Sequence, residues 1–358
     1  NAECDIEQAY IHLDNPLEMF FQKSDTLVSL TSIQNDVIFK VKRGTDRSAL
    51  APQFRLTEGA TIYPESGSRQ DFSNGPIIYT VTSQDKEWSR KYNVSFTLPP
   101  VVLNTINYDF STFEKNTNNP ANKYYVWYDK SDEGTKTFSW ATGNPGYYLS
   151  KTLAKSTDYP SVPVESELEE GKYCVKLTTR ATGSKAVRQQ MPIAAGNFFY
   201  GRFNANIALE HPMEATEFGW QINFKPVSFE GYYKYLRGEK VTDKDQNELA
   251  DKKDYGSIYA VLYDNEAGNK VLNGNDILTS ENIVALAKLP DIDDTPEWTN
   301  FNIDFQYSKD IDENKMKSYG YSLAIVCSSS VNGDKFEGAV GSTLWIDKFT
   351  IKCEKIDE

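Results

Sequence analysis

The clearest alternation of apolar and polar residues lies in the segment EFGWQINFKPVSFEGYYKYLRGE, which runs from Glu217 to Glu239. Trp220, Ile222 and Phe224 alternate with polar residues, and a period of two predicts a β-strand with these three side chains on one face. The segment is also the densest group of aromatic residues in the chain. It is therefore the first place to look for both a sheet core and a ligand surface.

The second half of this segment predicts a bend followed by another strand. Pro226 and Gly231 are strand breakers, and after them Tyr233 and Tyr235 share one face with Lys234 on the other. Aromatic rings beside a cation suit sugar recognition, because the apolar C–H face of a pyranose stacks on a ring while its hydroxyls bond polar groups. We therefore expect Tyr233, Lys234 and Tyr235 to bind a sugar. The alternative is that the rings form the core of a sandwich.

The first hundred residues predict a small sandwich of short strands. Turn-forming residues separate stretches in which apolar positions alternate with polar ones, namely Val37, Phe39 and Val41, then Tyr79 and Val81, then Tyr92, Val94 and Phe96. This spacing is typical of an immunoglobulin-like β-sandwich. Leu98, Pro99 and Pro100 form the expected linker, since consecutive prolines stiffen the chain and stop sheet pairing. The predicted domains are residues 1–100 and 101–358.

The larger unit predicts a two-sheet jelly roll with long loops. Its strand candidates are Tyr124–Tyr128, Tyr173–Thr179, Phe198–Ala205, Phe218–Phe224, Tyr233–Leu236, Ser257–Tyr263, Trp298–Phe305, Tyr321–Ser328 and Ser342–Lys352. Ile283–Leu289 and Asp310–Lys317 are expected to form short helical turns. The predicted class of the whole chain is all-β.

The charge of the chain restricts its partners. A net charge of -13 and a pI near 4.8 argue against nucleic acid as a partner and disfavour anionic membrane surfaces, because the field of the protein repels them. No apolar run approaches the ~20 residues of a membrane helix. The sequence opens at Asn1 without the pattern of a signal peptide, so we expect a mature or trimmed chain.

The cysteines do not predict a metal centre. Cys4, Cys174, Cys327 and Cys353 are widely separated, form no C-x-x-C pair and have no histidine near them in the sequence. The last three lie in predicted strands, where a small buried side chain is the simpler interpretation, with a disulfide between two of them as the alternative. No motif indicates a cofactor or a metal, and calcium held by loop carbonyls is the alternative left open.

The loop SWATGNPGYY, Ser139–Tyr148, supplies further candidate binding residues. Loops on a rigid sandwich often carry binding groups, and an exposed Trp is costly unless something covers it. Trp140 and Tyr148 are expected to stack on a sugar and Asn144 to bond its hydroxyls. On this hypothesis Trp140→Ala weakens binding with little loss of stability; the alternative is that the loop plugs the sheet.

Carboxylates are the other candidate chemistry, since a glycosidase needs two of them flanking the scissile bond. Glu165, Glu167 and Glu169 alternate, but prolines precede them and few apolar residues lie nearby, so a solvated loop is expected. Glu337 and Glu217 lie beside the strongest motifs and are the candidate catalytic residues by location.

The segment FRLTEGATIYPESGSRQDFSNGPIIYTVTSQD, Phe54–Asp85, has turns at Gly59 and Pro64 and a corner at Asp71-Phe72 before its last strand. With these features it resembles the bacterial immunoglobulin-like modules that precede carbohydrate-related domains in surface proteins of Bacteroidetes. The resemblance implies a spacer domain.

Four ordered motifs mark the larger unit: GNFFYGRF (Gly196–Phe203), the Gly-Tyr-Tyr-Lys-Tyr segment (Phe218–Gly238), GSIYAVLYD (Gly256–Asp264) and FEGAVGSTLWIDKFTI (Phe336–Ile351). Together they resemble the putative carbohydrate metabolism domain of Bacteroidetes proteins, over nearly all of residues 101–358. The resemblance implies a jelly roll related to carbohydrate-binding modules and to the sandwich domains of glycoside hydrolases. It also implies export, as a lipoprotein or a periplasmic protein.

The first functional hypothesis is a non-catalytic carbohydrate-binding protein of a glycan-utilisation system. Its partner would be an oligo- or polysaccharide, with other glycan-utilisation proteins as further partners. The first alternative is a glycoside hydrolase on the same jelly roll, with Glu337 or Glu217 as a carboxylate. The second is a surface adhesion protein.

Overall fold

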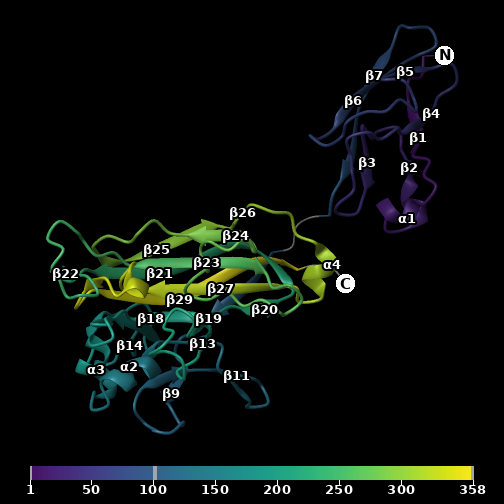
Figure 1. Ribbon diagram of the computed structural model, residues 1–358. Helices are drawn as coiled ribbons and strands as arrows, with labels where there is room; N and C mark the ends of the chain where they lie inside the picture. Colours follow the sequence, from purple (N-terminus) through teal and green to yellow (C-terminus); the bar gives the residue numbers. More distant parts are fainter. Residues whose placement is uncertain (1, 100–102, 356–358) are drawn as a thin grey trace. The chain divides into compact units, whose positions relative to one another are not determined.

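The computed structural model describes residues 2–99 and 103–355, and Pro100 of the expected linker lies outside them. The chain divides into two compact units, Asn1–Val101 and Val102–Glu358. Strands far outnumber helical segments in both units, which confirms the all-β class (Figure 1).

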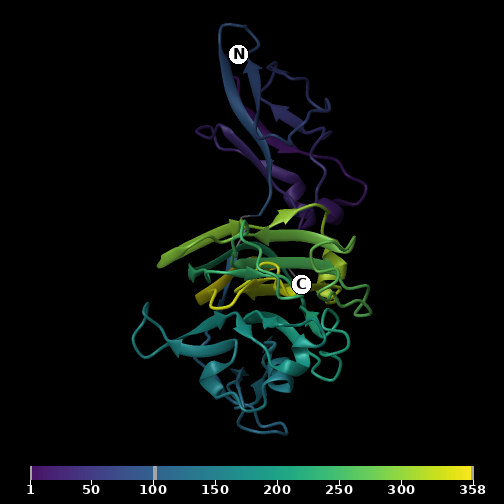
Figure 2. The same cartoon turned by 60° about the vertical axis from the view of Figure 1, so that its left-hand side comes forward.

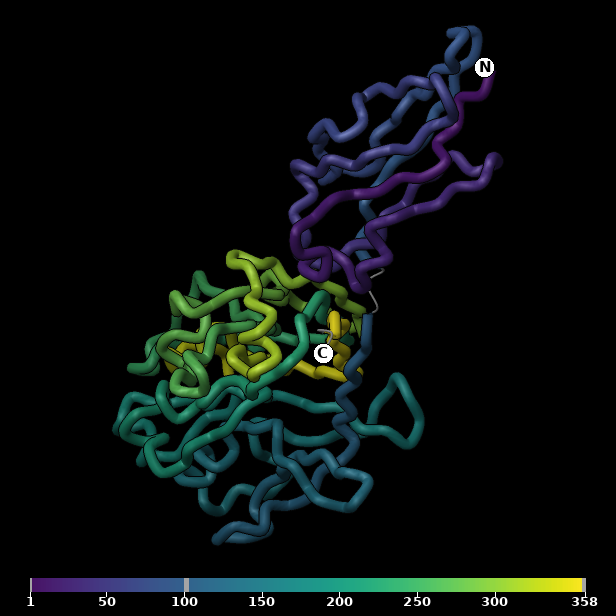
Figure 3. The backbone as a smooth tube through the Cα atoms, turned by 90° about the vertical axis from the view of Figure 1, so that its right-hand side faces the viewer, coloured from purple at the N-terminus to yellow at the C-terminus, as the bar shows by residue number. Residues whose placement is uncertain are grey.

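Unit 1 is an immunoglobulin-like sandwich of two sheets, as predicted. One sheet has the order β2 (Leu27–Ser29), β1 (Ile6–Tyr10), β4 (Gln53–Leu56); the other has the order β3 (Asp36–Lys40), β7 (Ser89–Thr97), β6 (Ile77–Thr82), β5 (Thr61–Tyr63). Only the β3–β7 pair is parallel among the described pairs of this unit. Helix α1 (Pro16–Met19) and the 3-10 turn η1 (Lys23–Thr26) connect the first two strands. The tube in Figure 3 follows these strands back and forth along the unit.

The core of unit 1 follows the predicted alternation. Val37 and Phe39 of β3 and Val94 and Phe96 of β7 are buried, while the residues between them face outward or are partly exposed. The rings of Phe39 and Phe96 stack with centroids 4.6 Å apart. Because buried aromatic side chains each remove a large apolar area from water, this cluster stabilises the sandwich.

Unit 2 is a jelly roll of two antiparallel sheets. The eight-stranded sheet has the order β13 (Trp140–Ala141), β18 (Asn197–Phe203), β27 (Tyr321–Ser328), β23 (Ser257–Asp264), β24 (Ile283–Lys288), β26 (Gln306–Tyr307), with β19 (Thr216–Phe218) on β18 and β20 (Trp220–Ile222) on β27. The six-stranded sheet has the order β14 (Ser161–Glu165), β15 (Tyr173–Thr178), β29 (Thr343–Lys355), β21 (Phe224–Leu236), β25 (Thr295–Asp304), with β8 (Leu103–Tyr108) on β29.

Shorter elements surround the sandwich. They are the strand pairs β9 (Phe113–Lys115) with β10 (Tyr125–Trp127), β11 (Asp129–Lys130) with β12 (Lys136–Thr137), β16 (Arg180–Ala181) with β17 (Ile193–Ala194) and β22 (Val241–Thr242) with β28 (Gly338–Ala339), and the helical segments α2 (Asn144–Ser150), η2 (Ser156–Asp158), α3 (Ser184–Val187), α4 (Glu313–Lys317) and η3 (Gly333–Lys335). In Figure 2 the teal part of unit 2, which contains α2 and α3, lies on one side of the long green and yellow strands.

The eight-stranded sheet is buried on both faces. Ile258 and Leu262 of β23 point into the core between the two sheets, while Tyr259, Val261 and Tyr263 belong to a second apolar cluster on the outer face. Phe218 of β19, and Leu272 and Ile277 of the segment after β23, also belong to this outer cluster. Strand β23 is therefore a continuous apolar run, as expected for a strand covered on both sides.

The predicted bend at Pro226 and Gly231 is wrong, because Phe224–Leu236 forms one 13-residue strand, β21. Pro226 pairs with β29 but not with β25, because the pairing with β25 begins only at Ser228. The missing N–H of Pro226 therefore leaves no hydrogen-bond acceptor of β25 without its donor. At Gly231 a Cβ atom would lie 2.5 Å from Phe349 and under 3 Å from a second ring. Gly231 therefore leaves room for these rings and does not form a turn.

Two smaller predictions have opposite outcomes. The expected helical turn at Ile283–Leu289 is wrong, since most of it is strand β24. The expected turn at Asp310–Lys317 is confirmed by α4, whose N-cap Asp312 accepts a hydrogen bond from the Lys315 amide.

Candidate functional site

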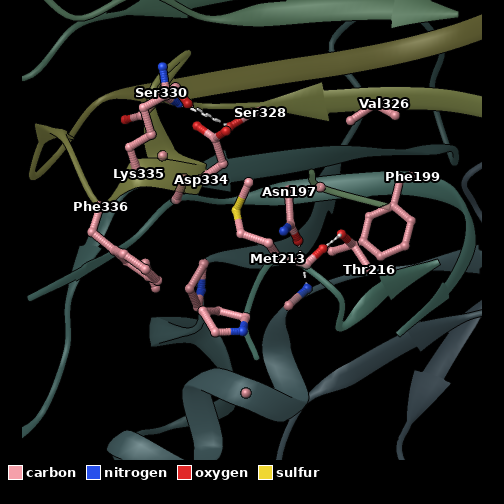
Figure 4. A pocket seen from close by; sticks show the side chains of 18 of the residues that line it. Asn197, Phe199, Met213, Thr216, Val326, Ser328, Ser330, Asp334, Lys335 and Phe336 are labelled. Atoms are coloured by element: carbon pink, nitrogen blue, oxygen red, sulfur yellow. Dashed lines mark hydrogen bonds between the residues drawn. The ribbon is translucent and has the colours of Figure 1, made fainter. Parts of the chain in front are cut away.

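A cavity with a volume of about 570 Å³ lies on the outer face of the eight-stranded sheet. We call it the sheet pocket. Strands β18, β23 and β27 form its floor, and α2 and the segments 208–216, 274–279 and 330–336 form its walls. Figure 4 shows side chains that line it, among them Asn197, Phe199, Thr216, Asp334 and Phe336.

Strand alternation explains how the floor is built. Phe198 points into the core between the sheets, so Asn197 and Phe199 on either side of it face the sheet pocket. Strand β23 repeats this pattern, with Ile258 in the core and Tyr259 on the floor. The period-two geometry of a strand therefore supplies an amide and two aromatic rings to one surface.

A buried carboxylate fixes the wall formed by residues 330–342. Asp254 Oδ2 accepts hydrogen bonds from Ser330 Oγ at 2.6 Å, from Ser342 Oγ at 2.7 Å and from the Ala339 amide at 2.8 Å. Burial raises the pKa of Asp254, and these hydrogen bonds offset part of the rise. Because the bonds reach both ends of the segment, one side chain holds the whole wall in place.

This wall presents Asp334 to the sheet pocket beside Tyr259. Asp334 is exposed, so solvent screens its charge; partial burial among neighbouring atoms raises its pKa, and Lys335 lowers the pKa in part. Burial also raises the pKa of Tyr259, and the charge of Asp334 adds to that rise. The pair offers a weakly acidic carboxyl and a neutral phenol, which together can accept and donate hydrogen bonds to hydroxyl groups.

Phe336 lies next to this pair in a strained conformation. Its backbone has φ 58° and ψ 30°, in the left-handed region that a bulky residue rarely adopts. Such strain persists where the surrounding structure fixes it, and it often accompanies functional positions. The strained turn brings a half-buried aromatic ring to the pocket wall.

The structure corrects the expected roles of the Ser139–Tyr148 loop. Trp140 is only 6% exposed and stacks on Phe198 at 4.6 Å in the core between the sheets, so its ring is not open to a ligand. Asn144 is fully buried, and its amide bonds the Ser161 backbone through both its oxygen and its nitrogen. Both residues fit the alternative interpretation, in which the loop packs onto the sheet as a plug.

Tyr233, Lys234 and Tyr235 do not form one surface. Tyr235 is fully buried and donates its hydroxyl to the Ser329 carbonyl, which corrects its expected role. Tyr233 is partly buried against the same core and contacts Phe301. Lys234 points to the opposite face, as the alternation predicted.

The other sequence candidates lie away from the sheet pocket. Tyr148 is partly buried in a small aromatic cluster, with Lys123 Nζ 6.0 Å from its ring centroid. Glu337 accepts from Lys252 Nζ at 2.8 Å, and Glu217 pairs with Arg202 at 3.1 Å. Neither acid lines either of the two cavities.

A second cavity, of about 430 Å³, lies beside strands β8, β21 and β29; we call it the carboxylate cleft. Burial raises the pKa of Asp347, which accepts a hydrogen bond from Ser166, and nearby Asp109 adds to the rise. Burial acts to raise the pKa of Asp109 too, but hydrogen bonds from Ser111 and Lys172 outweigh it and hold that pKa below its usual range. The cleft thus holds two carboxyl groups with oppositely shifted pKa values.

The sequence predictions did not select the residues that line the two cavities as binding residues, although several of them lie in the four motifs. All four motifs contribute to the sheet pocket, through Asn197, Phe218, Tyr259 and Phe336. The motif around Gly231 and the last motif both contribute to the carboxylate cleft. Asp334 in η3 and Asp109 after β8 lie outside all four motifs, in segments without strand alternation.

Neither metal binding nor membrane spanning has support in the parts of the chain that the structure describes. Within residues 2–99 and 103–355 no group of three or more His, Cys, Asp or Glu side chains is placed to hold a metal ion. All four cysteines are free, and three of them are buried. No helix in the same ranges has the length and apolar character needed to cross a bilayer.

Residues 111–352 match the model of the putative carbohydrate metabolism domain, and the chain belongs to that family. Residues 20–96 match the SGBP N-terminal domain. No curated protein matches the chain.

Two solved structures from Bacteroides are similar to this chain. One is described as a putative glycoside hydrolase from Bacteroides thetaiotaomicron; it is 35% identical, the match covers 100% of this chain and 98% of that one, and the TM-score is 0.62. The other, a putative glycoside hydrolase from Bacteroides vulgatus, is 34% identical over 69% of this chain and 98% of its own, with a TM-score of 0.63.

Proposed function

We propose that the chain is a carbohydrate-binding protein of a glycan-utilisation system and that it holds a sugar in the sheet pocket. The observation that carries the proposal is the pocket itself. It combines aromatic rings from strands and loops with an amide, hydroxyls and the raised-pKa carboxyl of Asp334. A concave, largely apolar site with a few convergent polar groups is the usual form of a small-molecule site.

The chemistry of the pocket matches the two kinds of surface on a sugar. Phe199 and Phe336 offer apolar contact to the C–H face of a pyranose, and Tyr259, Asp334 and Asn197 line the cavity with groups that bond hydroxyls. The volume of about 570 Å³ falls within the ~300–1,000 Å³ typical of ligand pockets. The family match independently supports a role in carbohydrate metabolism.

We also place the protein outside the cytoplasm, at the cell surface or in the periplasm. The match to the SGBP N-terminal domain and the resemblance of Phe54–Asp85 to surface modules support this location. Free thiols do not oppose it, because burial raises the pKa of Cys174 to about 12 and also raises the pKa of Cys327 well above its usual range, so both are poor nucleophiles.

A second candidate function is glycoside hydrolysis in the carboxylate cleft. The specific observation in its favour is the pair Asp109 and Asp347, whose pKa values are shifted in opposite directions. Such a pair can divide the roles of proton donor and anionic partner. The similar structures described as putative glycoside hydrolases add support.

A glycan-array screen of the full chain, run beside a reducing-sugar release assay on each retained polysaccharide, separates the candidates. Retention without release supports the binding protein. Release that Asp347→Asn abolishes supports hydrolysis in the carboxylate cleft. No retention and no release contradicts both and favours the adhesion alternative.

Variants of the sheet pocket then test the location of binding. Phe336→Ala removes a pocket ring, and Phe138→Ala removes a phenylalanine that is 46% exposed on the same unit and lines neither cavity. We expect the first variant to lose retention and the second to keep it. Equal retention by both variants contradicts the proposed site.

A further inference from the structure

A cluster of cations and tryptophans lies on the outer face of the six-stranded sheet, away from the sheet pocket. Lys234 of β21 pairs in register with Trp345 of β29, and Trp345 pairs with Lys176 of β15. Three adjacent strands therefore present these side chains side by side on one face. Arg180 is the first residue of β16, which begins two residues after β15 ends, and its charge acts on Lys176. We call Lys176, Arg180, Lys234, Trp298 and Trp345 the cation–tryptophan patch.

The rings hold the lysines at short range. Lys234 Nζ is 4.9 Å from the ring centroid of Trp345 and 5.2 Å from that of Trp298. Lys176 Nζ lies 5.8 Å from the Trp345 centroid. All four side chains are partly buried, so the two lysine charges are partly withdrawn from water.

One flank of the patch has its counter-ion and the other does not. Glu167 accepts two hydrogen bonds from Lys234 Nζ, both 2.9 Å, and one from Trp298 Nε1, also 2.9 Å. No carboxylate within the described ranges lies at ion-pair distance from Lys176 or Arg180. The Nε of Arg180 is buried without a hydrogen-bond partner.

These cations also repel one another. Burial lowers the pKa of Lys176, and the charges of Arg180 and Lys234 lower it further, which shows that the three groups are close enough to interact. Gathering like charges without a counter-charge is unfavourable. Glu167 supplies one negative charge to these three cations, and no acidic side chain in the described ranges forms an ion pair with Lys176 or Arg180, although the chain has 51 acidic residues. The counter-charge of Lys176 and Arg180 is therefore left to a negatively charged ligand.

We propose that the cation–tryptophan patch is a second glycan subsite, which binds a uronic acid residue. Its carboxylate sits between Lys176 and Arg180, and its ring contacts the indole of Trp345. This inference rests on the proposed function of the chain as a carbohydrate-binding protein, and it names the class of glycan: one that contains acidic sugars.

The acidic character of the whole chain does not prevent this. At ~0.15 M salt the Debye length is about 8 Å, so distant carboxylates are screened while charges in contact with the ligand act at nearly full strength. A guanidinium and an ammonium together suit a carboxylate through charge-assisted hydrogen bonds. We expect the affinity for the acidic sugar to fall as the salt concentration rises, and to fall more steeply than the affinity for a neutral sugar.

Calorimetric titration of the full chain with a galacturonic acid trimer, its methyl ester and a neutral galactose trimer tests the proposal. We expect the acid to bind at least ~10-fold more tightly than the ester, since each lost charged hydrogen bond is worth ~1.5–3 kcal/mol and 1.4 kcal/mol is tenfold. Lys176→Gln and Arg180→Gln should each remove this preference, and the control Lys244→Gln, at an exposed lysine, should keep it.

The outcomes separate this inference from the proposed function. If Phe336→Ala abolishes binding of the acid and the patch variants do not affect it, the second subsite is wrong and the sheet pocket stands. If the acid binds through the patch while Phe336→Ala changes no affinity, the sheet pocket is wrong. If acetate displaces the trimer at equal concentration, or if acid and ester bind equally, a uronic acid subsite is excluded.

Discussion

The hydroxyl of Ser330 donates a hydrogen bond of 2.6 Å to Oδ2 of Asp254, and this contact ties the wall of the sheet pocket to the body of the jelly roll. The same oxygen holds Ser342 and the Ala339 amide. A buried carboxylate that satisfies three donors is costly to replace, because each donor would lose its partner away from water. The shape of the pocket therefore depends on a residue that lies outside it.

Asp254→Asn should lower the free energy of unfolding by about 3 kcal/mol or more, since an amide cannot accept three hydrogen bonds at the same oxygen as well as a carboxylate does and adds a buried donor. Denaturant unfolding measures the change. Asp251→Asn, at an exposed acid three residues earlier, is the control and should change stability by less than about 0.5 kcal/mol. Similar values for the two variants would contradict the anchoring role.

Asp334→Asn should have opposite effects on stability and on binding. The folded state raises the pKa of Asp334 above 3.8, so at pH 7 the wild type holds a disfavoured charge; because this side chain is exposed and solvent screens its charge, the neutral variant should have only a slightly higher Tm. The difference should shrink as the pH falls through the raised pKa and vanish below 3.8, where the acid is protonated in both states. A pH series of thermal melts measures this, and a lower Tm for the variant at pH 7 would contradict it.

Binding by the same variant is expected to weaken, because an Asn cannot replace the carboxylate as an acceptor for two sugar hydroxyls. A variant that is more stable yet binds less well would identify Asp334 as a residue kept for function. Asp310→Asn, at an exposed acid outside the cavities, serves as the control and should leave binding unchanged.

Trp140→Ala should destabilise the protein strongly, whereas the sequence interpretation expected little loss of stability. Its ring is 6% exposed and contacts Phe198 and Phe110 at 4.6 Å and 5.3 Å, so its removal leaves a large cavity in the core. Losses of ~3–5 kcal/mol are usual for such a change. Chemical denaturation measures the loss, with Phe138→Ala, at an exposed ring, as the control. A loss under ~1 kcal/mol for Trp140→Ala would contradict the buried position of its ring.

Much of the fold could be predicted from the sequence, because the period of two is a local property. The alternation around Phe39 and Phe96 placed a sandwich core correctly. The motifs placed Tyr259 and Phe199 in strands, and the family resemblance supplied the jelly roll.

The site could not be predicted in the same way, because alternation separates two faces without showing which one is open. Trp140 and Tyr235 fall on buried faces, while Tyr259 lines a cavity, and only the pairing of distant strands decides this. Pro226 and Gly231 suggested a bend, but pairing with β29 on one side and ring packing on the other kept β21 continuous. Asp334 depends on a wall that Asp254 fixes from 80 residues away in the sequence.

The most direct test of the central claim is a calorimetric titration of the wild type and of Phe336→Ala with an oligosaccharide released from the polysaccharide that the array identifies. The sheet pocket account predicts at least ~10-fold weaker binding by Phe336→Ala, because the lost ring contact with the sugar is worth more than about 1.4 kcal/mol. Equal affinities for the two proteins, with both fully folded, would contradict it.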